Sequence, residues 1–180
     1  MSEEKTVNSK YLYRGHVVTL RLDTVQTGDG EESIREVVEH ADCIAVVAVD
    51  DKDNVLLVRQ LREAIGKELL EIPAGGIDPG ESVEDAVCRE MQEETGFLPQ
   101  KLVKLGGFYS SPGFCTEYLH LYLVTGFTPS RLFAEDTEDI TLVRVPVKDI
   151  PRLLASGQIQ DSKSIAGLYR YLAYIKENFR

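Results

Sequence analysis

Two short apolar runs set the main constraint on the fold of this chain. The first, CIAVVAV, covers residues 43–49, and the second, VLLVRQL, covers residues 55–61. Each run is continuous rather than alternating, which is typical of a strand buried on both faces. Between them, residues 50–54 (DDKDN) form a polar cluster of turn-forming residues. The pattern predicts two consecutive buried strands.

Further strand and helix patterns follow these runs. Mixed strands with helices between and after them predict an α/β or α+β sandwich. The last helical segment carries apolar residues at helical spacing, so we expect it to cover the core and assign it no chemistry. The additional strands are expected at LVKLGGFY, YLHLYLVTGF and ITLVRVPV, and the helices at residues 82–94, 147–155 and 164–178.

The first forty residues have a different pattern. Apolar and polar residues alternate in VTLRL (residues 18–22), GDG (28–30) marks a turn, and IREVVEH (34–40) resumes an extended pattern. This predicts an antiparallel β-hairpin. We therefore expect an N-terminal strand region over residues 1–40 and a main domain over residues 41–180.

The charge balance restricts the class of partner. The 180 residues are 43% apolar and 28% charged, which is the composition of a soluble globular protein. The formal net charge is −10 and the sequence pI is about 4.8. Because such a surface repels phosphate backbones, we expect no nucleic-acid partner. An acidic protein that binds a phosphorylated small molecule would need a cation to mediate.

Cysteine usage and hydropathy indicate a cytoplasmic protein. The three cysteines are widely spaced without a CxxC pair, which predicts neither a disulfide framework nor a zinc site. The N-terminus MSEEKTVNSK lacks the apolar segment of a secretory signal. The longest apolar run, residues 43–49, is far shorter than the ~20 residues that span a bilayer, so we expect no membrane contact.

The helix at residues 82–94 carries carboxylates on its inner face. Ser82 can cap its N-terminus. On a helical wheel the apolar residues define one face, and Glu90 and Glu94 fall in the middle of that face. Glu93 lies at its edge. The wheel therefore predicts that these acids point toward the protein body.

Such an arrangement is unfavourable unless a partner compensates the charges. Like charges four residues apart cost roughly 0.2–0.5 kcal/mol, and anions near a helix C-terminus oppose the macrodipole. Burial adds a much larger desolvation cost. A solvated charge run is the commoner explanation of a Glu-rich helix, but it would occupy the outer face. A hard divalent cation shared with a phosphorylated ligand resolves the conflict.

The loop before the helix is rich in glycine and proline. IPAGGIDPGE, residues 72–81, contains three glycines and two prolines. A backbone of this composition can come close to a ligand. A tight strand-to-helix connection would have the same composition, so the loop alone does not identify a site.

At these residues the chain resembles the Nudix hydrolase family. The resemblance covers about residues 41–180 and implies an α/β/α sandwich with a mixed β-sheet. It also implies hydrolysis of a nucleoside diphosphate linked to another group. The residues that match every fixed position of the Nudix box are Gly75, Glu81, Arg89-Glu90, Glu93-Glu94 and Gly96, with apolar Met91 and Phe97.

The resemblance further implies a metal site. Mg²⁺ is the expected ion, with Mn²⁺ able to substitute, and it would neutralise the diphosphate and activate a water. Arg89 would orient the acids, with Glu81 in support, and Glu93 and Glu94 would take part in catalysis. The implied metal ligands are Glu90, Glu93, Glu94 and a loop carbonyl, which we expect to be that of Ala74.

Other residues resemble the ADP-ribose pyrophosphatase subgroup. Pro112 lies sixteen residues after Gly96, and REVVEH (35–40) and VRQLR (58–62) are also similar to that subgroup. Taken alone, Pro112 would mark a turn and the arginines would form surface ion pairs. The resemblance instead implies substrate contacts, because a guanidinium matches phosphate oxygens. The expected substrate-binding residues are Arg35, Arg59, Arg62, Pro112 and, as a weaker candidate, Glu117.

Two further expectations come from the subgroup. An acidic residue of the loop FAEDTEDI would serve the attacking water; Glu135, Asp136 and Glu138 are all candidates, and we favour Glu138. The N-terminal strands, residues 11–40, would contact a second copy in a homodimer.

The leading hypothesis is an Mg²⁺-dependent ADP-ribose pyrophosphatase that releases AMP and ribose 5-phosphate. A second hypothesis keeps the chemistry and changes the substrate to another nucleoside diphosphate compound, such as GDP-mannose or NADH. A third is a module that senses a nucleotide without hydrolysis, although the box retains every glutamate. A plain cation-binding domain would not explain the loop, the spacing or the arginines.

Overall fold

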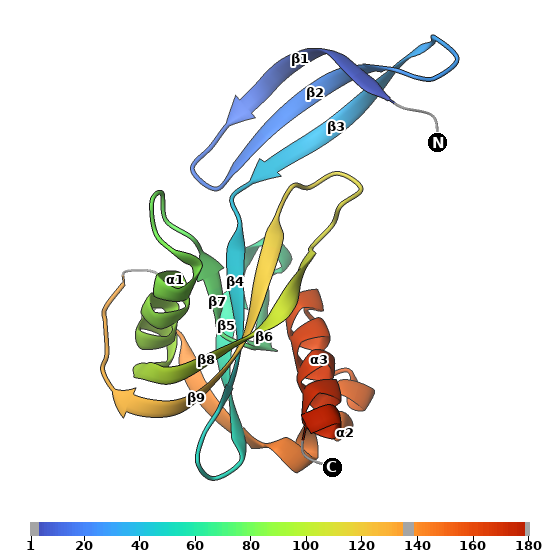
Figure 1. Cartoon of the computed structure of the whole chain (residues 1–180). Coiled ribbons are helices and arrows are strands. Elements are labelled where there is room, and N and C mark those ends of the chain that lie inside the picture. Colours follow the sequence, from blue (N-terminus) through green and yellow to red (C-terminus); the bar gives the residue numbers. More distant parts are fainter. Residues whose placement is uncertain (1–3, 135–138, 179–180) are drawn as a thin grey trace. The chain divides into compact units, whose positions relative to one another are not determined.

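The chain forms two compact units in a computed structural model that describes residues 4–134 and 139–178. One unit comprises Met1–Asp42 and Tyr109–Tyr118, and the other comprises Cys43–Phe108 and Leu119–Arg180 (Figure 1). The division into residues 1–40 and 41–180 remains a proposal about how the chain is organised.

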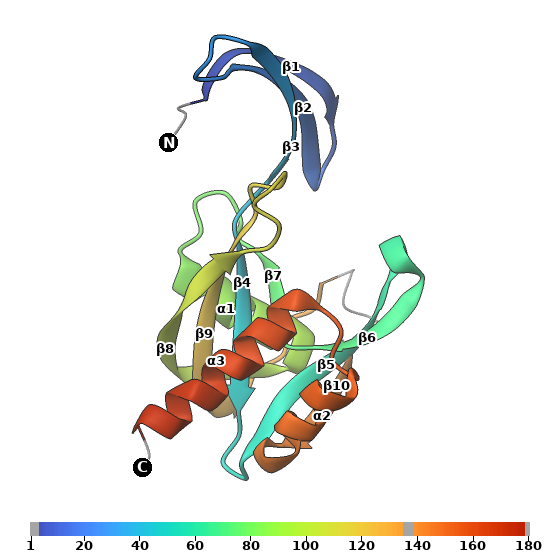
Figure 2. The ribbon, with the colours of Figure 1, turned by 90° about the vertical axis from the view of Figure 1, so that its right-hand side faces the viewer.

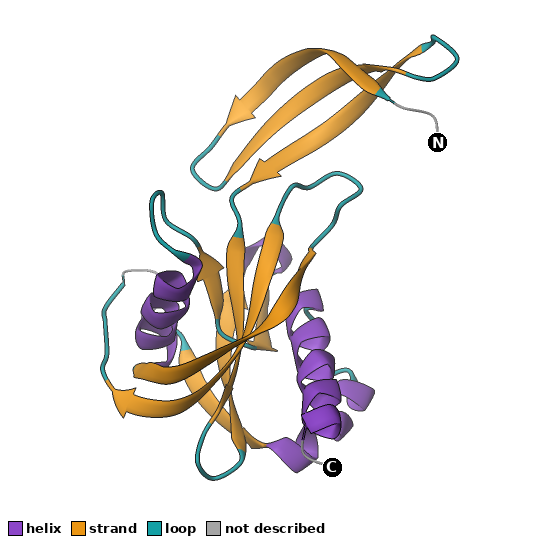
Figure 3. Cartoon of the chain, viewed as in Figure 1, coloured by secondary structure: helices purple, strands orange, loops and turns teal. Residues whose placement is uncertain are grey.

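Within the described residues, the second unit is built on a mixed sheet of seven strands (Figure 3). They are β4 (Cys43–Val49), β5 (Asn54–Arg62), β6 (Lys67–Glu71), β7 (Ala74–Gly76), β8 (Phe97–Tyr109), β9 (Tyr118–Pro129) and β10 (Thr141–Pro146). The main path runs β10–β5–β4–β9–β8, while β6 pairs with β5 and β7 pairs with β4. Because β4 is parallel to β9 and antiparallel to β5, the sheet is mixed as predicted.

The helices lie at the predicted segments. These are α1 (Val83–Glu90), α2 (Ile150–Ser156) and α3 (Ser162–Asn178). A π-helical turn, Met91–Thr95, continues α1 and was not predicted. Across residues 4–134 and 139–178, every helix is too short or too polar to cross a membrane.

The central strand β4 is buried on both faces because helices cover both sides of the sheet (Figure 1). Ile44 and Val46 pack in one core with residues of α1, whereas Ala45 and Val47 pack in the other with residues of α2 and α3. Figure 2 shows α2 and α3 together on the face turned toward the viewer. The predicted α/β/α sandwich is confirmed.

From residue 4 onward, where the structure describes it, the N-terminal unit contains three antiparallel strands, so the predicted hairpin is incomplete. They are β1 (Lys5–Arg14), β2 (Val18–Gln26) and β3 (Glu32–His40), in the order β1–β2–β3. The β2–β3 hairpin is present, and β1 pairs along the other edge of β2. Every residue of β1 is exposed, which explains why its sequence carries no clear pattern of strand burial.

The connection between β8 and β9 belongs to the N-terminal unit. The Val38 N–H donates a hydrogen bond to the Phe114 carbonyl at 2.7 Å, and the Thr116 N–H donates to the Val38 carbonyl at 3.0 Å. The connection therefore pairs with β3 at one isolated bridge, between Val38 and Cys115. This pairing places Pro112 and Arg35 in the same unit.

Candidate active site

A strand, a loop and a helix place the acidic side chains of the second unit. The loop between β7 and α1 ends at Ser82, whose Oγ accepts a hydrogen bond from the Asp85 N–H at 3.1 Å. This is the predicted N-cap. At the other end, Gly96 has φ +80°, a left-handed conformation that favours glycine and stops the helix.

Two of the three box glutamates that follow Arg89 are buried. Glu90 is 8% exposed and Glu94 is 5% exposed, whereas Glu93 is partly exposed. The prediction that Glu90 and Glu94 point toward the protein body is confirmed by their burial. The π-helical turn that carries Glu93 and Glu94 is a rare conformation, and such turns occur frequently at functional sites.

Arg89 connects the acids to one another and to the loop. Its guanidinium donates to both oxygens of Glu81 at 2.9 Å, to Glu90 Oε1 at 2.6 Å and to Glu93 Oε2 at 3.1 Å. It also donates to the Gly76 carbonyl at 2.7 Å. The Arg89 guanidinium in turn holds the pKa of Glu81 below its usual value. This geometry is what the expected orienting role of Arg89 requires.

The loop backbone meets the buried glutamates directly. The Ala74 N–H donates a hydrogen bond to Glu94 Oε2 at 3.1 Å. At Gly75, a Cβ atom would lie 2.0 Å from Glu90 Oε1. The first glycine of the box is therefore explained by space, because the Glu90 carboxylate occupies the place of a side chain. That the Ala74 carbonyl binds a metal stays a prediction.

The electrostatic surroundings of Glu94 are unfavourable to a free carboxylate. Burial, followed by the charge of Glu90, raises the pKa of Glu94 to about 8, against the opposing effects of the Ala74 amide, Lys163 and Arg62. At neutral pH and without a cation, Glu94 therefore retains a proton. A bound cation would take the place of that proton.

These residues fit a divalent metal ion of the hard, oxygen-preferring class. The donors are carboxylates beside an exposed glycine loop, and Mg²⁺ is bound in proteins by one or two carboxylates together with waters and substrate phosphates. Burial and the neighbouring charge of Glu90 raise the pKa of Glu94, and a cation beside the two carboxylates would offset both effects. Glu90, Glu93, Glu94 and the Ala74 carbonyl are the groups that would hold the ion.

Arg62 is within electrostatic range of Glu94 but is engaged in an ion pair. Its Nε and Nη2 donate to the two carboxylate oxygens of Glu71 at 2.9 Å and 2.6 Å. Glu71 also accepts from the Lys163 ammonium group. Burial raises the pKa of Glu71, but the two cations outweigh it and leave the pKa below its ordinary value. Glu71 and Lys163 are outside the box, and neither was predicted as a site residue because no motif in the sequence marks them.

Arg59 is exposed and leaves β5 on the face opposite to Arg62, because the two residues are three positions apart on one strand. A substrate contact for Arg59 stays a prediction. Arg62, in contrast, is close enough to Glu94 for its charge to oppose the rise that burial causes in the pKa of Glu94.

Arg35 and Pro112 come together in the N-terminal unit. Both line a hollow of about 340 Å³, together with Asp23 and Phe114. The Arg35 Nε donates to Glu4 Oε2 at 3.2 Å, so a carboxylate already occupies part of its donor capacity. Two residues predicted from separate motifs thus share one concave surface.

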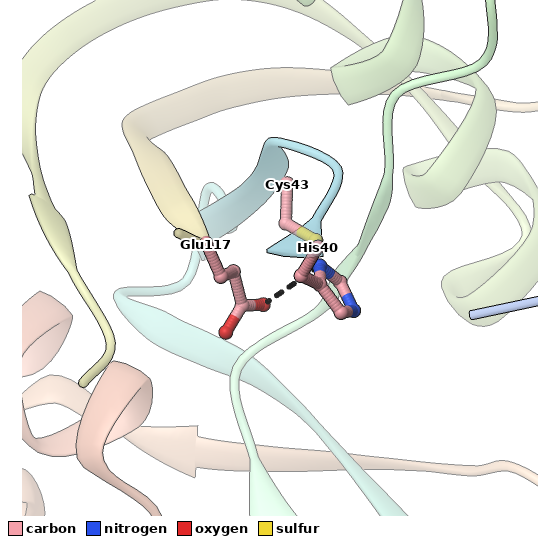
Figure 4. Close-up of side chains that lie close together, drawn as sticks. All are labelled: His40, Cys43 and Glu117. Atoms are coloured by element: carbon pink, nitrogen blue, oxygen red, sulfur yellow. Dashed lines mark ion pairs between the residues drawn. The ribbon is translucent and has the colours of Figure 1, made fainter. Parts of the chain in front are cut away.

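Two further predicted site residues remain, of which the structure describes only Glu117. Glu117 belongs to the N-terminal unit, where its Oε1 lies 3.9 Å from Nδ1 of His40 (Figure 4). Its contact with a substrate stays a prediction. Glu138, together with the alternatives Glu135 and Asp136, lies outside the described residues.

Family comparisons cover nearly the whole chain. The family described as "NUDIX domain" matches residues 39–168, and the family described as "Nucleoside diphosphate sugar hydrolase N-terminal domain" matches residues 4–38. The first match contains every residue of the glutamate cluster, and the second covers most of the three-stranded N-terminal sheet.

Curated relatives and a solved structure extend this result. An ADP-ribose pyrophosphatase of Bacillus subtilis is 35% identical over 90% of this chain and 89% of its own length. An ADP-ribose pyrophosphatase of Mycobacterium tuberculosis is 36% identical over 91% of this chain and 81% of its own length. A GDP-mannose pyrophosphatase of Yersinia pestis is 31% identical over 87% of this chain and 83% of its own. A crystal structure of an ADP compounds hydrolase has the same fold, with a TM-score of 0.90 at 22% identity over 99% of this chain and 97% of its own.

Proposed function

Because this chain belongs to the Nudix hydrolase family, we propose that it hydrolyses the diphosphate bond of ADP-ribose to AMP and ribose 5-phosphate. The coarser activity is that of a nucleoside diphosphate sugar hydrolase. The observation that carries the proposal is the glutamate cluster: two buried carboxylates that contact the Ala74–Gly75 backbone and one arginine that joins the acids.

Different residues of the chain have different roles in this reaction. When bound, a divalent cation would neutralise the diphosphate and lower the pKa of a water. Arg89 holds Glu90 and Glu93 in place, and the Ala74 amide holds Glu94, so these carboxylates are oriented before substrate arrives. Hydrolysis adds the oxygen of one water to one phosphorus, breaks the P–O–P bond and releases two monophosphates.

We favour ADP-ribose as the substrate because two ADP-ribose pyrophosphatases are more similar to this chain than the GDP-mannose pyrophosphatase is. GDP-mannose is the second candidate substrate, since its relative also covers most of this chain. A product assay with ADP-ribose, GDP-mannose and NADH, with Mg²⁺ and with chelator, separates the candidates. The highest kcat/KM is expected for ADP-ribose; a higher value for GDP-mannose would overturn the substrate assignment and retain the hydrolase.

Gly75→Ala is expected to reduce kcat on the order of 10²-fold, because the new methyl group displaces the Glu90 carboxylate from its position. The unfolding temperature should change little, since the displaced group is the end of a flexible side chain. Gly76→Ala is the matched control, because a Cβ atom there meets nothing within 4 Å. Equal kcat values for the two variants would contradict the argument.

Metal affinity is expected to rise with pH. The pKa of Glu94 is about 8, and the cation binds the deprotonated form, so binding releases a proton below that pH. Mn²⁺ affinity should therefore increase about tenfold per pH unit up to about pH 8 and level off above it. Isothermal titration calorimetry at several pH values measures this, and a flat profile would show that Glu94 is not a ligand.

We propose a homodimer formed through the N-terminal unit. Its three strands and the turn between β1 and β2 expose several large apolar side chains: Val7, Tyr11, Leu12, Tyr13, Val17 and Ile34. Exposed apolar groups gathered on one small sheet favour association. Sedimentation equilibrium should give twice the 20.1 kDa chain mass, and Leu12→Glu with Ile34→Glu should give the single mass. A monomeric wild type would reject the dimer.

A further inference from the structure

The beginning of α3 contacts the strand that leads into the candidate site. Lys163 Nζ donates to the Glu71 carboxylate and to Asp161 Oδ2, the latter at 2.9 Å. The next residue, Ser164, accepts at its Oγ a hydrogen bond from the Ile72 N–H at 2.8 Å. Two consecutive residues of α3 therefore hold the last residue of β6, Glu71, and the residue that follows it, Ile72.

These contacts are buried and closely packed. Glu71, Ile72 and Ser164 are each 0% exposed. One turn further along α3, a Cβ atom at Gly167 would lie 2.8 Å from Ile72 Cδ1, so the helix backbone lies directly against this side chain. Removing one partner of such a buried contact leaves the other without compensation. The close packing and the buried hydrogen bond therefore fix the position of Ile72 against α3.

A very short length of chain joins these contacts to the glutamates. The Pro73 carbonyl accepts a hydrogen bond from the Val46 N–H at 2.9 Å. The next residue, Ala74, donates to Glu94, and Gly75 lies against Glu90. Every residue from Glu71 to Gly75 thus has a contact of its own, and these five residues connect the start of α3 to the glutamate cluster.

We infer that Lys163 and Ser164 are positioning residues, which hold the segment Ile72–Gly75 at the distance from Glu90 and Glu94 that metal binding requires. The inference rests on the proposed function in taking these two glutamates as metal ligands. In this role Lys163 and Ser164 act through the segment Glu71–Gly75. The Lys163 charge also acts on Glu94, so Ser164→Ala, which changes no charge, isolates the effect of position. The final helix, expected to serve in packing alone, thereby contributes to the site.

The test is the Mn²⁺ dissociation constant of the substrate-free protein, measured by electron paramagnetic resonance for the wild type, Lys163→Met, Lys163→Arg and Ser164→Ala. Lys163→Met is expected to weaken Mn²⁺ binding about tenfold, the effect typical of residues that orient metal ligands. Lys163→Arg keeps the charge and should recover most of the affinity. With ADP-ribose, Lys163→Met should lower kcat more than it changes KM.

Lys176→Met is the matched control, because it removes an exposed lysine from the same helix. A folded Lys163→Met protein that binds Mn²⁺ as tightly as the wild type would overturn the inference. If Lys163→Met does not fold, Ser164→Ala carries the same test, since it removes a single hydroxyl group. Because Mn²⁺ binding needs no turnover, a wild type that does not cleave ADP-ribose would reject the proposed substrate without changing this result.

Discussion

Glu94→Gln is expected to lower kcat on the order of 10³-fold and, in the absence of metal, to raise the unfolding temperature. The loss of activity follows because a neutral amide is a poor ligand for a cation that supplies several kcal/mol of transition-state stabilisation. The gain in stability follows because Glu94 is a buried carboxyl next to Glu90, where ionisation is unfavourable.

The pH dependence of that gain has a definite sign. The pKa of Glu94 is about 8 in the folded protein and 4.5 for an ordinary glutamate, so between these values the folded state holds a proton that the unfolded state has released. The wild type therefore loses stability from this group as pH rises toward 8, and the loss is complete above that pH. The advantage of Glu94→Gln should grow over the same interval and then stay constant.

Thermal unfolding of metal-free wild type and Glu94→Gln across this pH range measures the effect. Glu177→Gln, at an exposed position of α3, is the control and should change neither stability nor kcat. A Glu94→Gln protein that is less stable than the wild type throughout the range would show that the Glu94 carboxylate is compensated within the protein itself.

Arg89→Met is expected to destabilise the metal-free protein by about 2 kcal/mol, below the 3–5 kcal/mol of a fully buried pair because the arginine side chain is 24% exposed. The variant leaves Glu81 and Glu90 without their shared guanidinium. Activity should fall as well, since the carboxylates lose the group that orients them. Urea unfolding with and without Mg²⁺ measures the change in free energy.

Added Mg²⁺ should restore part of the stability of Arg89→Met, because a cation bound only by the folded state shifts the equilibrium toward it. Arg152→Met is the matched control, since it removes an exposed arginine from α2. Equal losses of stability in the two variants would mean that the contacts of Arg89 do not hold the acids together.

The parts of the fold with a clear hydrophobic pattern were predictable from the sequence. The apolar run at residues 43–49 and the face of α1 each gave the correct element. β7 has three residues, Ala74–Gly76, and β1 is exposed along its length, so neither produces a pattern of burial. The π-helical turn is defined by its hydrogen bonding within the helix rather than by composition, so no residue pattern predicted this turn.

Some residues of the candidate site were also predictable from the sequence, and others were not. Glu90 and Glu94 were found because they break the rule that charge avoids the inner face of a helix. The Glu71–Lys163 ion pair joins residues 92 positions apart, so no local spacing marks it. Its members become visible only when β6 and α3 are placed side by side, and the same holds for the space at Gly75 that Glu90 fills.

The central claim is that the buried glutamates hold a divalent cation, and an Mn²⁺ titration of wild type and Glu94→Gln at pH 8 tests it most directly. We expect saturable binding to the wild type and affinity weaker by about 10–100-fold in the variant. Identical Mn²⁺ affinities for the two proteins would contradict the account, because the cation would then bind elsewhere and the burial of Glu94 would need another explanation.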